Sequence, residues 1–138
     1  MHENLSGEFI RGDLIGLPFP DATFDAVFDI CSFSQNKFGQ IRKIIGESRR
    51  VLKNGGVFFS MFFKEGCWGD GLGKKIEPGT FTEIPEGPFH ELGVTHFATE
   101  AEVIELFGQF SSFSYETITR TFDERKREVS YWLITAKR

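Results

Sequence analysis

Two histidines, His90 and His96, stand six positions apart in the stretch "FHELGVTHFATE". Because imidazole titrates near neutral pH, either side chain could bind a substrate or move a proton. No cysteine or cluster of carboxylates accompanies them at a spacing typical of metal ligands, so the pattern does not indicate a metal site. Ordinary positions in a loop or at a helix entry are the simpler interpretation of both histidines.

The cysteines offer less chemistry. The chain has two, Cys31 inside an apolar run and Cys67 beside Trp68 in a glycine-rich stretch. A loop cysteine without a positive neighbour or a partner histidine is weak evidence for a nucleophile, although Cys67 and Trp68 suit a lid. Two cysteines give no disulfide framework, so we expect reduced thiols in a cytoplasmic protein.

Composition narrows the classes of partner. The 138 residues carry 16 basic and 20 acidic side chains, a net charge of −4, with no basic excess that would favour nucleic acid. The N-terminus has no apolar core of a signal peptide, and no apolar stretch approaches the length of a membrane span. We therefore expect neither nucleic acid nor a membrane as partner.

The first elements surround a proline corner. Residues 8–12, "EFIRG", are short, partly apolar and closed by glycine, which indicates a strand. Residues 16–24, "GLPFPDATF", cannot be regular structure, because two prolines fix φ and remove backbone donors. Residues 25–33, "DAVFDICSF", then have the density of apolar side chains that is typical of a buried strand.

A strand–helix–strand unit follows. Apolar residues recur at helical spacing over 38–53, and basic residues fall mostly on the opposite face, where Glu47 is placed to pair with Arg50. "NGG" at 54–56 is interpreted as a helix stop, and "VFFSMFF" at 57–63 as a strand buried on both sides. Residues 25–63 thus predict a right-handed parallel βαβ unit.

The second half combines a long loop with a helix and a hairpin. Residues 64–97 are rich in glycine and proline and are predicted to be an irregular, functional loop. "TEAE" at 99–102 is a capping box, which predicts a helix continuing to Phe110. The last 26 residues predict two antiparallel strands around a turn near Asp123–Lys126.

Two segments together resemble a known family. "GDLIGLPFPDATFDAVFDI" at 12–30 is similar to the "GD-x-x-x-LPF-x-D-x-x-FD-x-V" segment of class I S-adenosylmethionine-dependent methyltransferases. "ESRRVLKNGGVFFSMF" at 47–62 is similar to their "E-x-x-RVLK-x-GG" junction between a helix and a strand. The resemblance implies an α/β, partial Rossmann-like methyltransferase fold, in which a mostly parallel sheet ends in a C-terminal antiparallel hairpin.

The resemblance also implies S-adenosylmethionine as the cofactor. The Asp13 carboxylate would accept from the adenine amino group, and the Leu14 N–H would donate to a ring nitrogen. The simpler alternative for Asp13 is a plain turn carboxylate. Ile30, Cys31 and Ser32, at the end of the strand, would pass beside the methionine part of the cofactor.

Candidates for the substrate side are weaker. Phe33 follows the cofactor segment in "CSFSQN", and Ser34 stands where related small methyltransferases often carry a histidine. No general base is therefore indicated there. His90 and His96 remain candidates for substrate contact, and the loop 64–97 is predicted to select the acceptor.

One part of the family pattern does not occur in these residues. The acidic glycine-rich turn "E/D-x-G-x-G-x-G", and the second acidic residue that takes the ribose hydroxyls, are both missing from the 138 residues. We therefore interpret the chain as a single methyltransferase-like domain that lacks the family's first two strands and helices. Such a chain would pair its strands differently, form a homodimer through the exposed sheet edge, or belong to something larger.

Two functions follow from this interpretation. The first is S-adenosylmethionine-dependent methyl transfer to a small-molecule acceptor, by the C-terminal part of such an enzyme. The alternative is an inactive methyltransferase-like remnant that serves in self-association or protein assembly.

Overall fold

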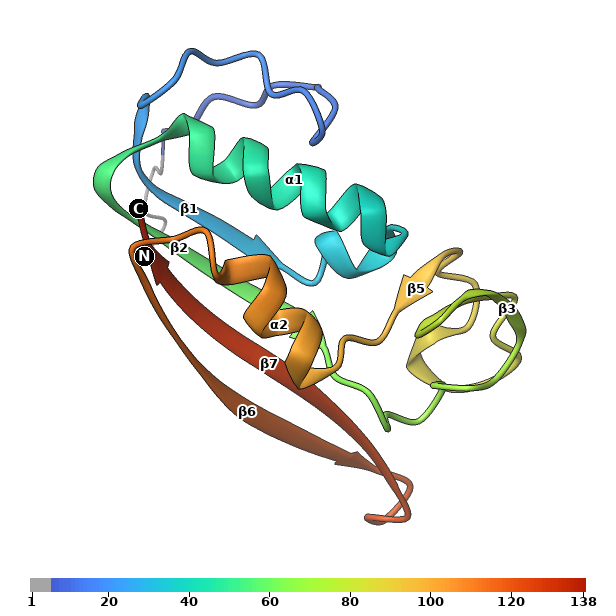
Figure 1. Ribbon diagram of the computed structural model, residues 1–138. Helices are drawn as coiled ribbons and strands as arrows, with labels where there is room; N and C mark the ends of the chain where they lie inside the picture. The colour runs from blue at the N-terminus through green and yellow to red at the C-terminus, as the bar shows by residue number, and fades with distance from the viewer. Residues whose placement is uncertain (1–5) are drawn as a thin grey trace.

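The computed structural model describes residues 6–138. A four-stranded mixed sheet forms the centre of the molecule (Figure 1). The strands lie in the order β1 (Phe24–Ile30), β2 (Leu52–Phe63), β7 (Arg127–Lys137) and β6 (Ser112–Phe122). β1 and β2 are parallel, whereas β7 is antiparallel to both β2 and β6. The α/β fold with a C-terminal antiparallel hairpin is confirmed.

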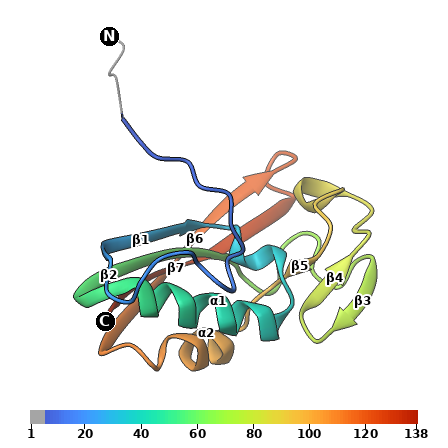
Figure 2. The ribbon, with the colours of Figure 1, turned by 90° about the horizontal axis from the view of Figure 1, so that it is seen from above.

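Both helices cover the same face of this sheet (Figure 2). In α1 (Phe38–Val51) the predicted apolar positions Ile41, Ile44 and Ile45 are buried. In α2 (Glu100–Phe107) the capping box is present, because the Thr99 hydroxyl accepts from the Glu102 N–H at 3.2 Å. Side chains of the strands and helices pack together in one hydrophobic core between the sheet and the helices. Its large members include Phe33, Phe58, Phe62, Phe107, Trp132 and Ile134.

The opposite face of the sheet has no helix among the described residues, and its part on β1 and β2 is apolar. On β1, Phe28 is 73 % exposed and Ile30 62 % exposed. Their partners across the parallel ladder are Phe59 and Met61. Since β1 is also an edge strand, the molecule presents an apolar sheet face beside an unpaired backbone edge.

Residues 64–97 are not the irregular loop that the sequence predicts. They contain a small antiparallel sheet of β3 (Lys74–Glu77), β4 (Thr80–Thr82) and β5 (Thr95–His96), which we call with its connections the 64–97 module. The buried module side chains Phe81, Phe89 and Phe97 share an aromatic core with Phe63 at the end of β2. Strands of two to four residues have too few positions to show a period, so they escape prediction.

Two further expectations fail. Residues 8–12 form no strand; they are exposed and pair with neither sheet, which leaves the parallel part of the sheet smaller than predicted. "NGG" does not end α1, which stops at Val51. It bulges out of β2 between the pairs Phe24–Leu52 and Ala26–Val57, where Gly55 has a φ of 79° and its N–H donates to the Arg138 carbonyl at 2.7 Å.

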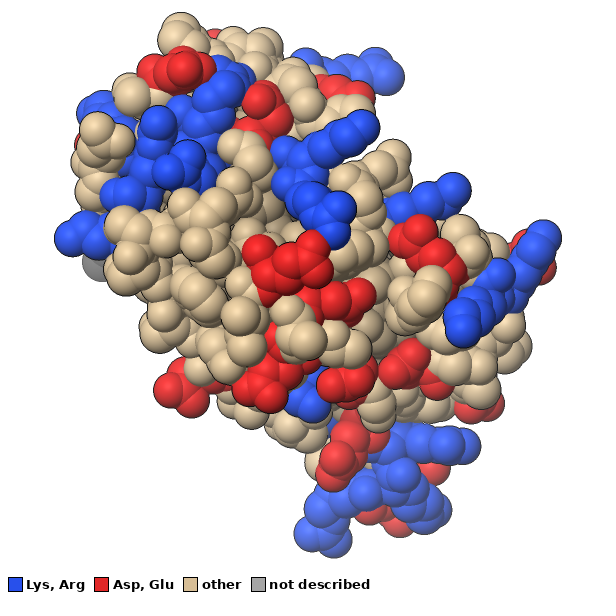
Figure 3. All heavy atoms as spheres, in the orientation of Figure 1, with Lys and Arg blue, Asp and Glu red and all other residues tan. Residues whose placement is uncertain are grey.

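Acidic and basic side chains gather in separate places on the surface of the helices (Figure 3). Acidic residues gather on α2, whose first turn contains Glu100 and Glu102, and the last turn of α1 contains Arg49 and Arg50. Both arrangements complement the helix dipole. Within residues 6–138, no helix is long and apolar enough to cross a membrane.

Candidate functional site

A tight turn at Asp13 forms one wall of a surface cavity. Asp13 accepts at its side chain from the Ile15 N–H at 3.0 Å, and at its carbonyl from the Gly16 N–H at 3.1 Å. Asp13 and Leu14 are therefore held at the surface in a defined geometry. The cavity has a volume of about 650 Å³ and is lined by residues 11–15, by Asn36 before α1, and by Gln40 and Ile44 within α1.

The proline corner after this turn is fixed by α1. The Arg50 guanidinium donates to the carbonyl oxygens of Leu17 at 3.1 Å and Phe19 at 2.8 Å, and to Asp21 at 2.8 Å. Glu47 pairs with Arg50 at 2.7 Å, as predicted, and also accepts from the Leu17 N–H at 2.8 Å. The hydrogen bonds from Arg50 lower the pKa of Glu47. Sequence analysis missed the role of Arg50, because helical spacing places it on an exposed face.

A second turn follows β1 at its carboxyl end. Cys31 adopts a left-handed conformation with a φ of 62°, and its N–H donates to the Met61 carbonyl at 2.9 Å. Ile30 and Ser32 are exposed on either side of Cys31. Burial and the nearby Asp29 raise the pKa of the Cys31 thiol to about 11, so the thiol stays protonated at neutral pH.

Asp29 holds this second turn, and sequence analysis did not single it out. Its carboxylate is 3 % exposed and accepts from the Ser32 N–H at 3.1 Å, the Ser32 hydroxyl and the Phe33 N–H at 3.3 Å. Its other oxygen accepts from the Ser60 hydroxyl at 2.8 Å. Burial raises the pKa of Asp29 in spite of these hydrogen bonds. The signal in the sequence was an aspartate inside an apolar strand.

Asn36 connects the two turns. Its side-chain amide donates to the carbonyl oxygens of Ser32 at 3.3 Å and Phe33 at 3.2 Å, and it lines the same cavity as Asp13. The predicted cofactor residues at 13–14 and at 30–32 therefore lie at the same end of the molecule, around the start of α1.

The two residues that follow the cofactor segment belong to the interior. Phe33 is 4 % exposed and packs against Phe58 and Phe62, with ring centroids 5.9 and 6.2 Å apart. Ser34 is fully buried, and its hydroxyl accepts from the Phe63 N–H at 3.1 Å. Packing of this kind favours a structural role for both residues.

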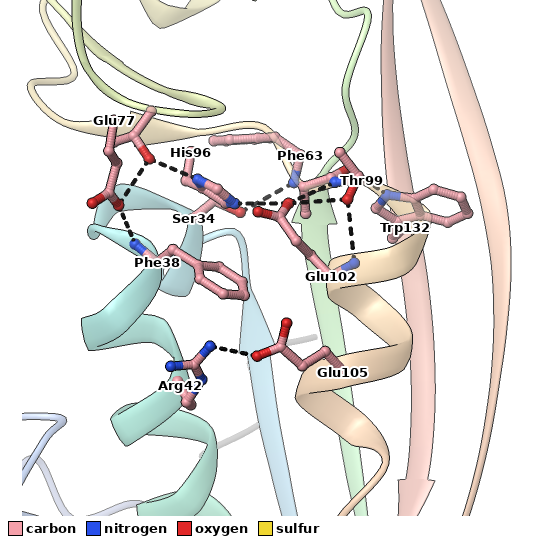
Figure 4. A network of polar contacts seen from close by, with 12 residues as sticks. Ser34, Phe38, Arg42, Phe63, Glu77, His96, Thr99, Glu102, Glu105 and Trp132 are labelled. Atoms are coloured by element: carbon pink, nitrogen blue, oxygen red, sulfur yellow. Dashed lines mark hydrogen bonds and ion pairs between the residues drawn. The ribbon is translucent and has the colours of Figure 1, made fainter.

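His96 lies at the centre of a buried polar network (Figure 4). It is fully buried; its Nδ1 lies 2.7 Å from the Thr80 hydroxyl and its Nε2 lies 3.2 Å from the Glu102 carboxylate. Glu77 extends the network, because it accepts from the Thr80 hydroxyl and from the Phe38 N–H at the start of α1. The network joins the 64–97 module to both helices, which favours a structural role for His96.

His90 lies elsewhere. It is exposed and lines a separate cavity of about 390 Å³ with other module residues, including Glu83 and Pro85. The structure does not bring His90 together with His96 or with the 650 Å³ cavity. Among residues 6–138, no group of three or more His, Cys, Asp or Glu side chains is arranged to hold a metal ion.

The residues of the 650 Å³ cavity fit the nucleoside part of S-adenosylmethionine. Asp13 supplies a carboxylate beside the exposed Leu14, and the apolar side chains of Leu14, Ile15 and Ile44 line the cavity. A purine needs this combination of an acceptor for its amino group and apolar contact for its faces.

Part of the chain is similar in sequence to methyltransferases. Residues 2–60 match a family described as a methyltransferase domain. A demethylmenaquinone methyltransferase of Thermotoga maritima is 46 % identical over 50 residues, which cover 36 % of this chain and 21 % of the relative. A sterol 24-C-methyltransferase of Gibberella zeae is 41 % identical over 51 residues, which cover 37 % and 13 %. The matches thus span less than a quarter of these relatives' length.

Solved structures share the fold over nearly the whole chain. A methyltransferase of Methanosarcina mazei has a TM-score of 0.66 and 20 % identity, covering 91 % of this chain and 65 % of that one. A methyltransferase of Mesorhizobium loti has a TM-score of 0.67 and 13 % identity, covering 99 % and 72 %.

A third structure contains bound ligands. The 1,6-didemethyltoxoflavin-N1-methyltransferase of Burkholderia thailandensis, solved with 1,6-didemethyltoxoflavin and S-adenosylhomocysteine, has a TM-score of 0.61 and 18 % identity, covering 94 % of this chain and 50 % of that one. Residues 2–60 are thus similar in sequence to a methyltransferase domain, and the chain shares the fold of S-adenosylmethionine-dependent methyltransferases.

Proposed function

We propose that the chain takes part in S-adenosylmethionine-dependent methyl transfer to a small-molecule acceptor, and that its two turns form one side of the cofactor site. The observation that carries the proposal is that Asn36 lines the Asp13 cavity and donates to the carbonyl oxygens of Ser32 and Phe33 in the turn after β1. The carboxyl end of a parallel strand is also where ligands bind in open α/β sheets.

The role of these residues in the reaction is to bind and orient. S-adenosylmethionine, when bound, supplies an activated methyl group. Asp13 and Leu14 would hold the adenine edge, and the rigid proline corner would keep them in register with Ile30, Cys31 and Ser32. Methyl transfer to a good nucleophile depends mainly on in-line placement and exclusion of water, so this chain needs few catalytic side chains.

The acceptor would be selected by the 64–97 module. Its aromatic core packs against Cys31 from the cofactor segment and against Tyr131 of β7. The module therefore lies beside the point where the methyl group would leave the cofactor. The names of the relatives give different acceptors (demethylmenaquinone, a sterol and 1,6-didemethyltoxoflavin), and all of them are small molecules.

Calorimetric titration of the purified chain with S-adenosylhomocysteine tests the proposal. We expect a micromolar dissociation constant that Asp13→Ala raises by at least about tenfold. Asp13→Asn removes the charge but keeps the acceptor for the Ile15 N–H. Asp25→Ala is the control, because it removes an exposed carboxylate that pairs with Lys53 and does not line the cavity. An equal loss in Asp13→Ala and Asp25→Ala would overturn the assignment.

Self-association is a second candidate function, favoured by the apolar sheet face beside the unpaired β1 edge. Phe28 and Ile30 on that face are mostly exposed. A second copy of the chain that paired its own β1 edge would satisfy the backbone groups and cover both side chains. Titration with the cofactor separates the two candidates, because self-association alone requires no ligand.

A further inference from the structure

Two features that cost free energy of folding lie together at the turn after β1. Asp29 is a buried carboxylate whose pKa is raised, which means that burial disfavours its charge more than four hydrogen bonds favour it. Two positions later, Cys31 adopts a left-handed backbone conformation that side chains other than glycine rarely take. Strain and desolvated charge of this kind cluster at binding and catalytic sites.

The hydrogen bonds of Asp29 show what the carboxylate controls. One oxygen accepts from the N–H groups of Ser32 and Phe33, and the other reaches across to the Ser60 hydroxyl on β2. The carboxylate therefore fixes the segment 30–32 against the neighbouring strand. It also places a negative charge directly beneath the backbone that the proposed function assigns to the methionine part of the cofactor.

We propose that Asp29 sets the cofactor preference of this site: its carboxylate positions residues 30–32, and its charge favours the sulfonium cation of S-adenosylmethionine over the neutral thioether of S-adenosylhomocysteine. The inference rests on the proposed function and adds a positioning residue to it. A charge in a partly buried site is weakly screened, so it acts on a nearby cation more strongly than a surface carboxylate does.

Asp29→Asn separates charge from position. Asparagine can still accept from Ser32 and Phe33 through its carbonyl oxygen, and its amide can donate to the Ser60 hydroxyl oxygen. The turn is therefore retained while the charge is lost. Asp25→Asn is the matched control, because it makes the same change on the same strand at a carboxylate that is 87 % exposed and paired with Lys53.

The experiment measures dissociation constants for both ligands in each variant by calorimetry. We expect Asp29→Asn to weaken S-adenosylmethionine on the order of tenfold and to leave S-adenosylhomocysteine within about twofold, and Asp25→Asn to change neither. Ser60→Ala removes one hydrogen bond but keeps the charge, so it should keep the preference for S-adenosylmethionine.

Each other outcome has a distinct meaning. If Asp29→Asn weakens the binding of both ligands equally, Asp29 acts through structure alone. If binding is unchanged, Asp29 neither positions residues 30–32 for the ligand nor favours the cation. Both results overturn the inference while the proposed function stands. If the folded wild-type chain binds neither ligand, the proposed function fails and this inference fails with it. Circular dichroism of each variant confirms that the chain is folded.

Discussion

Arg50 shows how a single side chain can fix a binding wall that it does not itself form. Its guanidinium reaches two carbonyl oxygens and Asp21 in the proline corner, and Glu47 braces it from the same helix face. The corner carries the chain away from the Asp13 turn, so the position of the proposed adenine contacts depends on these hydrogen bonds.

Replacing Arg50 with alanine should loosen the corner without unfolding the protein. We expect the amide proton of Leu17, which donates to Glu47, to exchange with solvent at least about tenfold faster, because local opening becomes easier. The amide of Ile45 in the buried face of α1 should be unchanged. Lys43→Ala on the exposed face of α1 is the control, and equal exchange of Leu17 in both variants would contradict this account.

Asp29 should make stability depend on pH. Because the folded-state pKa lies above the ordinary value of 3.8, the folded protein binds the proton more tightly than the unfolded chain does. Stability contributed by Asp29 is therefore fully present below 3.8 and is lost as the pH rises through the raised pKa.

Asp29→Asn removes this dependence. Relative to the wild type, the variant should gain stability as the pH rises from about 3 towards 7, by about 1.4 kcal/mol for each unit by which the pKa of Asp29 is raised. Urea unfolding at a series of pH values measures the difference. A gain that shrank with rising pH would contradict the assignment of a raised pKa to Asp29.

Among individual residues, the sequence predicted well what is local. The capping box at Thr99 and Glu102 and the pair Glu47–Arg50 depend on spacing along one helix, and both are present. The contacts of Arg50 with residues 17–21 and of Asp29 with Ser60 join positions about 30 residues apart, and a single sequence shows no period that reports such contacts.

At the scale of elements, the His96 network explains how the 64–97 module is held to the helices. β3, β4 and β5 make only a small sheet, and its attachment to α1 and α2 includes buried polar contacts through Glu77, His96 and Glu102. In a buried setting such a network is stabilising only while every member keeps its partner.

His96→Ala should therefore be strongly destabilising. The variant leaves a cavity and removes the buried partner of Thr80 and Glu102, which together cost about 2–4 kcal/mol. Denaturant unfolding gives this difference directly. The control is His90→Ala, at an exposed position of the same module, whose free energy of unfolding should lie within about 0.5 kcal/mol of the wild type. An equally small loss of stability in His96→Ala would show that the network contributes little.

The elements that the sequence predicted correctly are those in which a hydrophobic period extends over many residues or a turn is clearly marked. α1, α2 and the β6–β7 hairpin were all expected near their observed positions. The strand at 8–12 was wrong because strand propensity is fulfilled only beside a partner strand, and the described residues offer none to this segment. The "NGG" stretch serves a bulge in β2 instead of a helix stop, since a positive φ suits either turn.

At the scale of the whole molecule, the sheet is covered on one face and open on the other. The helices protect Phe58 and Phe62, whereas Phe28, Ile30 and Val57 remain exposed on the opposite face. An apolar face beside an unpaired edge is sticky in water, so we expect the chain to self-associate at micromolar concentration.

Phe28→Lys should weaken this association. A charge on the open face at the β1 edge opposes burial against a second copy, so sedimentation velocity should show a shift from dimer to monomer. Ile104→Lys places the same charge at a half-exposed apolar position on α2, and it should leave the dimer unchanged. A wild-type chain that is strictly monomeric would remove the second candidate function.

The central claim is that the Asp13 turn and the turn after β1 act as one cofactor site. Amide chemical shifts of the labelled chain, followed during titration with S-adenosylhomocysteine, test this claim most directly. The account predicts that Leu14, Ser32 and Asn36 shift together with one dissociation constant, while Glu91 beside the separate module cavity stays fixed. Shifts confined to one turn, or none in a folded chain, would contradict it.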